Sequence, residues 1–140
     1  MTPKPQPRSR STNTDSPLGA GCQQRCTVAA RAASSKLGHD TVVLSVSELV
    51  GFTDAFVITS GTNARQVRTI SDEVERQLKL AGADGPLSVE GRDDARWVLL
   101  DYGDFVVHVF LAEARGFYDL EHLWADAPQW AWDGHALAGT

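Results

Sequence analysis

The order of apolar patterns along the chain predicts one α/β domain, with a mixed sheet of about five strands and helices packed on it. Short β-branched and aromatic runs alternate with helical segments, so at least one helix connects strands that pair in parallel. Further along, two such runs lie only four residues apart, which predicts an antiparallel hairpin. A length of 140 residues fits one domain. We divide it into a disordered arm (1–21), the α/β domain (22–128) and a frayed tail (129–140).

The first half of the domain is predicted to contain two helices and two strands. An alanine-rich helix over residues 23–37 stops at Gly38. Strands follow at 41–46 and 54–59, where β-branched residues dominate. The next helix begins after Asn63, which supplies N-cap chemistry, and runs for about five turns. Its apolar residues recur at helical spacing before a glycine stop: Val67, Ile70, Val74 and Leu78, followed by Gly82.

The second half is predicted to contain a short strand, the hairpin and a last helix. Residues 88–90 are the short strand, directly before Gly91. The hairpin strands are 97–100 and 105–110, and residues 101–104 between them carry the Asp and Gly that tight turns need. In the last helix, the apolar residues Phe117, Leu120 and Trp124 recur at spacings of three and four.

The charge balance restricts the class of partner. The first 31 residues contain five basic side chains and one acidic, which leaves 8 basic and 17 acidic side chains in the rest. A domain this acidic repels phosphate backbones, so we expect no direct nucleic-acid binding and a basic protein as partner. No apolar run reaches the ~18 residues of a membrane span, so we expect a soluble protein. We expect it in the cytoplasm, since its cysteines do not require an oxidising compartment. The basic arm also fits an organelle transit peptide or an extended start.

The cysteines and the polar motifs do not make a convincing active site. Cys22 and Cys26 would share one helical face, but a zinc site needs more ligands, so we expect two reduced thiols and no metal. The Ser-Gly-Thr-Asn turn at residues 60–63 could present backbone amides to a phosphate. A nucleotidyltransferase also needs paired carboxylates for Mg²⁺, and Asp72 and Glu73 fall inside a helix. We therefore predict an N-cap and a tight junction there, with no cofactor and no catalysis.

The first hairpin strand offers a candidate binding surface. Trp97 and Leu99 point to one side of it and Leu100 to the other. If helices cover only one face of the sheet, Trp97 is exposed, and Asp101 and Asp104 beside it complete the anatomy of a protein-binding hot spot. If helices cover both faces, Trp97 is a core residue. The sequence leaves both alternatives open.

Three segments together resemble a known family. Residues 97–124, WVLLDYGDFVVHVFLAEARGFYDLEHLW, resemble the C-terminal half of the ribosomal silencing factor family, also called the Iojap-like family. The segments DAFVITSGTNARQV (54–67) and Glu90-Gly91 fall in the order and approximate spacing of that family. The resemblance covers about residues 40–128 and implies a topology like that of the nucleotidyltransferases.

The resemblance also implies a function. It implies a protein that represses translation under nutrient limitation, by binding the large ribosomal subunit through ribosomal protein L-fourteen and sterically blocking joining of the small subunit. The resemblance further implies a homodimer when the protein is free. A nucleotidyltransferase-like enzyme and an assembly factor for the large subunit are the alternatives. The implied partner-binding residues are Trp97, Leu99, Leu100, Asp101, Tyr102, Asp104, His108, Arg115, Tyr118, Glu121 and Trp124.

Overall fold

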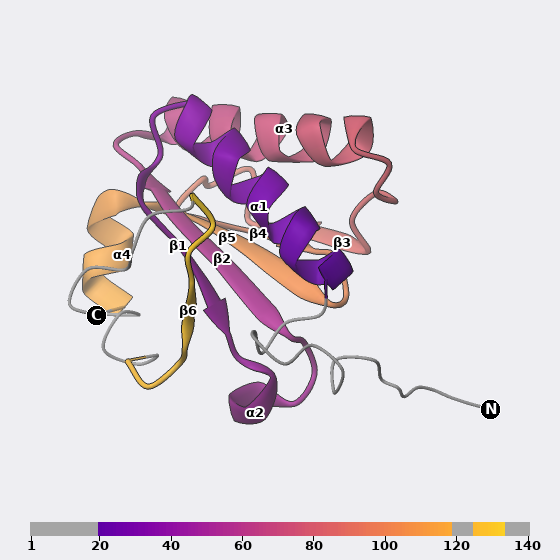
Figure 1. Cartoon of the computed structure of the whole chain (residues 1–140). Coiled ribbons are helices and arrows are strands. Elements are labelled where there is room, and N and C mark those ends of the chain that lie inside the picture. The colour runs from indigo at the N-terminus through magenta and orange to yellow at the C-terminus, as the bar shows by residue number, and fades with distance from the viewer. Residues whose placement is uncertain (1–19, 119–124, 134–140) are drawn as a thin grey trace.

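A six-stranded mixed sheet forms the centre of the protein, and the computed structural model describes residues 20–118 and 125–133. In chain order the elements are α1 (Ala20–Ser35), β1 (His39–Ser45), α2 (Ser47–Val50), β2 (Ala55–Gly61), α3 (Ala64–Leu80), β3 (Ser88–Glu90), β4 (Trp97–Asp101), β5 (Phe105–Leu111), α4 (Ala112–Tyr118) and β6 (Gln129–Trp130). The strand order is β3-β4-β5-β2-β1-β6, and β2 and β5 pair in parallel. Helices α1 and α3 lie side by side on one face of this sheet (Figure 1). The predicted α/β class with a mixed sheet is confirmed.

The main core lies between the sheet and these two helices. Val57, Val98 and Leu100 are fully buried or nearly so, and they belong to the same cluster as the inner faces of α1 and α3. Alanines dominate the contribution of α1, and small side chains let this helix approach the sheet closely. The alternation of buried residues in β4 therefore assigns Val98 and Leu100 to the side that the helices cover.

The sheet has one strand more than predicted. Strand β6 pairs with β1, with Val43 opposite Trp130. The indole N–H of Trp130 donates to Thr27 Oγ1 at 3.3 Å, and that of Trp132 donates to Thr41 O at 3.1 Å. The expectation of a frayed tail is therefore corrected for residues 129–133. A strand of two residues is too short to leave a periodic pattern, and the partial burial of two large aromatic side chains, Trp130 and Trp132, helps to hold it on the edge.

The turn between β2 and α3 is closed by its own hydrogen bonds. The Asn63 side chain accepts from the Gln66 backbone N–H at 2.9 Å, and Gln66 Oε1 accepts from the Thr62 N–H at 2.7 Å. A Cβ on Gly61 would lie 3.1 Å from the Val67 backbone nitrogen, so the strand and the helix meet at a tight junction. The interpretation of residues 60–63 as an N-cap and a junction is confirmed.

Three helices differ from the prediction. Helix α1 covers Ala20–Ser35 and not residues 23–37, so it begins inside the predicted arm. Helix α2 was not predicted, because one turn of four residues leaves no helical period; it ends at Gly51, whose φ of 78° is left-handed. Helix α4 follows β5 directly and begins at Ala112, five residues before Phe117, where the predicted stripe starts. Leu120 and Trp124 of that stripe lie outside the described residues. No helix among the described residues is both long and apolar enough to cross a membrane.

Candidate protein-binding surface

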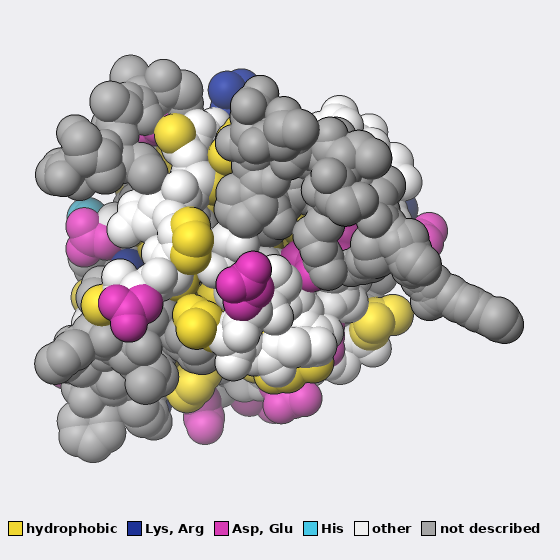
Figure 2. Space-filling view, turned by 60° about the horizontal axis from the view of Figure 1, so that its bottom comes forward, with side chains coloured by type: hydrophobic (Ala, Val, Ile, Leu, Met, Phe, Trp, Pro, Cys, Tyr) yellow, Lys and Arg dark blue, Asp and Glu magenta, His cyan; other side chains and the backbone are white. Residues whose placement is uncertain are grey.

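The sheet face turned away from α1 and α3, here called the outer face, carries a second apolar cluster. Trp97 and Leu99 of β4 are partly buried and pack against it, as does Val50 of α2. Figure 2 shows hydrophobic side chains beside Asp and Glu side chains on the lower side of the molecule. The buried members of the cluster are Leu44, Val46, Phe56, Ile58, Val106, Phe110 and Ala127.

Trp97 lies on the outer face, and it is neither the exposed residue nor the core residue between which the sequence left the choice open. Its ring packs on Phe110, with ring centroids 4.8 Å apart, and its indole N–H donates to His108 Nδ1 at 3.0 Å. The side chain nevertheless keeps part of its surface exposed, as do Leu99 and Asp101, which follow at every second position of β4. A row of partly exposed apolar and acidic side chains therefore runs along the outer face of this strand.

His108 lies behind that row on β5, directly opposite Leu99, and is only 6% exposed. Burial lowers its pKa from 6.5 to about 4, so the imidazole is neutral at pH 7. An indole N–H can only donate, so Nδ1 must accept and the proton of the neutral ring is on Nε2. Nε2 is buried and has no hydrogen-bond partner within the described part of the chain.

The buried imidazole predicts a pH dependence of stability. Below pH 6.5 the unfolded chain binds a proton at His108 that the folded protein does not bind until about pH 4, so acid favours unfolding across this window. At about 1.4 kcal/mol per pH unit, the loss of folding free energy approaches about 3 kcal/mol. Urea unfolding of wild type and His108→Gln at several pH values measures this loss. The difference in unfolding free energy between wild type and His108→Gln should change between pH 6.5 and 4 and stay constant above pH 6.5. If both proteins lose stability equally as the pH falls, the pKa of His108 is not lowered by folding.

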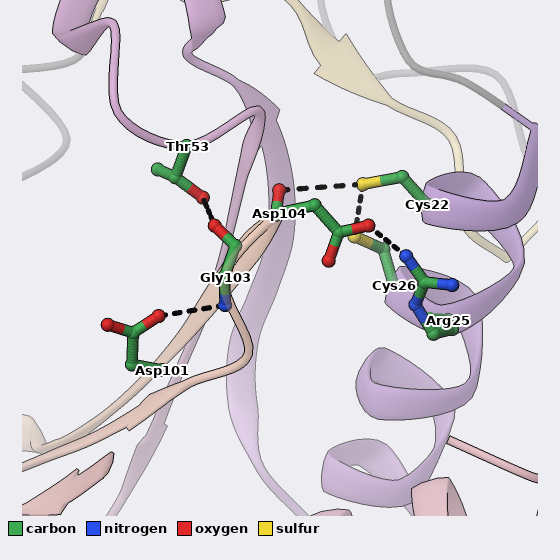
Figure 3. A network of polar contacts seen from close by, with 7 residues as sticks. All are labelled: Cys22, Arg25, Cys26, Thr53, Asp101, Gly103 and Asp104. Atoms are coloured by element: carbon green, nitrogen blue, oxygen red, sulfur yellow. Dashed lines mark hydrogen bonds and ion pairs between the residues drawn. The ribbon is translucent and has the colours of Figure 1, made fainter. Parts of the chain in front are cut away.

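The hairpin turn beside this surface is held in place by side chains on both sides (Figure 3). Asp101 Oδ1 accepts from the Gly103 N–H at 2.8 Å, and Thr53 Oγ1 donates to Gly103 O at 2.9 Å. The Asp104 carboxylate is paired with the guanidinium of Arg25 on α1. Asp101 therefore helps to shape the turn and stays partly exposed, whereas Asp104 is already engaged with a cation of the same chain.

The two cysteines lie on α1 beside the turn, as Figure 3 also shows. Their sulfurs are 3.9 Å apart, and Cys22 Sγ donates to Asp104 O at 3.7 Å. The hydrogen bond that Cys26 makes with Cys22, together with burial, raises the pKa of Cys26 well above its ordinary value, which keeps that thiol protonated. Both cysteines are buried and neither forms a disulfide, and no group of three or more metal-ligating side chains occurs among the described residues.

The structure distributes the remaining candidates over different environments. Leu100 is fully buried under the helices, so it belongs to the core and presents no surface to a partner. Tyr102 stacks on Phe105 on the helix-covered side, with centroids 4.9 Å apart, and burial raises its pKa to about 12. Arg115 is 5% exposed, and its guanidinium donates to Ser60 Oγ at 2.8 Å. Three candidates have side chains outside the described part of the chain: Tyr118, Glu121 and Trp124.

The sequence interpretation missed two exposed apolar residues, one in α2 and one in the loop after it. Leu49 of α2 is 52% exposed, and Phe52 in the loop after it is 72% exposed. No sequence period marks them, because α2 has one turn and the loop has none. A feature of the sequence that could have indicated this exposed position is Phe52 itself. It is a large aromatic residue between Gly51 and Thr53, in a loop that precedes a fully buried strand.

Comparison with known proteins identifies the family. A family model described as "Ribosomal silencing factor during starvation" matches residues 20–138. The chain belongs to the ribosomal silencing factor family. The ribosomal silencing factor of Bacillus subtilis is 41% identical over 101 residues, which cover 72% of this chain and 85% of the relative. A mouse protein, named for mitochondrial assembly of the ribosomal large subunit, is 34% identical over 88 residues, which cover 61% of this chain and 39% of that protein.

Solved structures of similar proteins share the silencing-factor fold. A crystal structure of a Chromobacterium violaceum protein superposes with a TM-score of 0.70 at 36% identity, covering 74% of this chain and 85% of that one. A Bacillus halodurans protein gives a TM-score of 0.66 at 34% identity, covering 77% of this chain and 97% of that one. The curated relatives cited above are named for silencing or assembly of ribosomes, and neither name describes an enzyme.

Proposed function

We propose that this protein represses translation by binding the large ribosomal subunit through ribosomal protein L-fourteen, at the face where the small subunit joins. Bound there, it blocks joining by its bulk, and no catalytic step is needed. Membership of the silencing-factor family supports the general role. In this proposal the free protein is cytoplasmic and forms a homodimer.

One observation supports this choice above the others: the partly exposed row of Trp97, Leu99 and Asp101 on the outer face. An aromatic anchor with an apolar neighbour and a charged rim is the usual composition of a binding hot spot. The acidic balance of the domain suits a basic ribosomal protein, because complementary charge speeds and orients association. We assign the anchors to Trp97 and Leu99 and the contact with a partner Lys or Arg to Asp101.

A role in assembly of the large subunit is the second candidate, and the similarity to the mouse protein favours it. Both roles would use the same surface. Deleting the gene discriminates between them, since loss of an assembly factor leaves precursor particles. Loss of a silencing factor leaves normal particles, together with a failure to shut down translation on starvation.

Cosedimentation with separated ribosomal subunits tests the proposal. Purified protein is incubated with large subunits, with small subunits, or with a reassociated mixture, and each sample is run through a sucrose gradient. We expect the protein to move with the large subunit and to reduce the fraction of joined ribosomes. Absence of binding to either subunit would refute the proposal, and thermal melting with nucleotide and Mg²⁺ would then test the turn at residues 60–63.

A further inference from the structure

His108 is a buried polar side chain in an otherwise apolar part of the outer face. Strand β5 holds it opposite Ile58 of β2 on one side and opposite Leu99 of β4 on the other. Its ring meets Phe56 edge-on, with centroids 4.5 Å apart, and lies nearly parallel to Phe110 at 6.2 Å. Because these rings pack around it and it is only 6% exposed, the imidazole has little freedom to rotate.

The imidazole at this position costs folding free energy relative to an apolar side chain. Its Nε2 is buried without a hydrogen-bond partner in the described part of the chain. A buried N–H left unpaired is destabilising, so packing alone would favour a side chain of similar size without polar atoms, such as leucine. The other ring nitrogen, Nδ1, accepts the hydrogen bond from the Trp97 indole at 3.0 Å. That bond is the interaction that a leucine could not make.

The bond between Trp97 and His108 runs diagonally between neighbouring strands. Trp97 lies directly opposite Phe110, two residues along β5 from His108, and the indole packs on the Phe110 ring with the planes tilted by 34°. Packing of one ring on another is compatible with either flipped orientation of the indole, whereas the N–H···N bond is compatible with one. The hydrogen bond therefore determines which edge of the indole is turned toward β5 and which edge is turned away from it.

We propose that His108 is a positioning residue of the binding surface: its Nδ1 fixes the orientation of the Trp97 indole before the partner arrives, and His108 itself does not touch the partner. The inference rests on the proposed function, since it takes Trp97 as the anchor that the ribosomal protein contacts. An anchor that is already oriented loses less conformational freedom on binding, so affinity rises without a new contact. The burial of His108 fits this indirect role.

Two substitutions at position 108 separate the hydrogen bond from packing. Asparagine carries its amide oxygen close to where histidine carries Nδ1, so it retains an acceptor but leaves a cavity; leucine fills the space of the ring and has no acceptor. Binding of the full chain to the large subunit is measured by cosedimentation, and stability by thermal melting. We expect His108→Asn to bind within about two-fold of wild type and His108→Leu to bind about five-fold more weakly, although His108→Leu melts at the higher temperature of the two. If packing alone mattered, His108→Leu would be the tighter binder of the two.

Val107→Ala is the matched control for a loss of stability. Val107 precedes His108 on β5, but it is fully buried in the main core under the helices, on the opposite face of the sheet. Its truncation should lower the melting temperature and leave binding like that of wild type. If Val107→Ala weakened binding as much as His108→Leu, the loss of affinity would reflect stability, and the positioning role would be overturned.

A double-mutant cycle with Trp97→Phe shows whether His108 acts through the indole. Phenylalanine has no N–H to donate, so His108→Leu should weaken binding of the wild-type chain and leave binding of the Trp97→Phe chain unchanged. In proton–nitrogen NMR spectra, the indole N–H signal of Trp97, identified by its loss in Trp97→Phe, should move more in His108→Leu than in His108→Asn. Equal effects of His108→Leu in both backgrounds would overturn the positioning role.

The wild-type chain separates failure of this inference from failure of the proposed function. If wild type does not bind the large subunit, the proposed function is refuted, and the NMR comparison alone still decides whether His108 orients the indole. If wild type binds and His108→Leu binds equally well, the proposed function stands and the positioning role is overturned.

Discussion

Replacing Trp97 by glutamate is expected to abolish binding to the large ribosomal subunit while the sheet stays folded. The indole is the largest partly exposed apolar side chain of the β4 row, and truncation of such anchors costs about 2–4 kcal/mol of binding, roughly 30- to 1000-fold in affinity. A carboxylate adds a desolvation penalty at an interface that excludes water. Binding is measured by cosedimentation, and folding by circular dichroism and thermal melting.

Val89→Glu is the matched control for Trp97→Glu. Val89 is 41% exposed on β3, opposite Leu100, so it points to the helix-covered side of the sheet. Glutamate at this position adds the same negative charge on the side of the sheet away from the outer face. We expect Val89→Glu to bind the large subunit like wild type. Normal binding by Trp97→Glu would remove the outer face from the proposal. An unfolded Trp97→Glu would instead show that the contacts with Phe110 and His108 make the indole essential to the core.

Regular patterns in the sequence predicted most of the fold. The helical spacing of Val67, Ile70, Val74 and Leu78 gave α3, and all four side chains are buried in it. The hairpin followed from two β-branched runs around an Asp-Gly turn, and β4 and β5 pair antiparallel around it. These elements are predictable because local spacing and turn chemistry determine them. The short elements α2 and β6 depend on contacts made elsewhere in the fold, so no local pattern marks them.

The candidate surface was only partly predictable, because tertiary contacts decide which polar groups remain available. Asp104 seemed equivalent to Asp101 in the sequence, yet Arg25, 79 residues earlier, pairs with it. The resemblance implies His108 as a partner-binding residue, and the structure places it buried on β5, where it accepts a hydrogen bond from the indole of Trp97. The exposed position of Phe52 depends on hydrogen bonds between its loop and the hairpin turn, and no spacing in the chain predicts those bonds.

Gly91→Ala is expected to be strongly destabilising, because the glycine lies against the beginning of β4. Its φ is 81°, and a Cβ there would lie 2.0 Å from the carbonyl oxygen of Trp97. That oxygen belongs to the backbone, so the overlap can be relieved only by moving β3 away from β4. We expect a loss of at least ~3 kcal/mol in the free energy of unfolding, measured by urea denaturation. Partial separation of the strands would also displace Trp97 and weaken subunit binding.

Gly82→Ala separates this steric effect from the cost of a left-handed backbone. Gly82 has a φ of 92°, yet nothing lies within 4 Å of the position that its Cβ would take. Alanine at Gly82 should therefore cost only about 1–2 kcal/mol, the usual penalty for an L-residue in this conformation. The difference between the two variants measures the close approach of Gly91 to Trp97 alone. Equal losses of unfolding free energy in the two variants would mean that β3 and β4 can separate freely at this point. The close approach to Trp97 would then not explain the glycine at position 91.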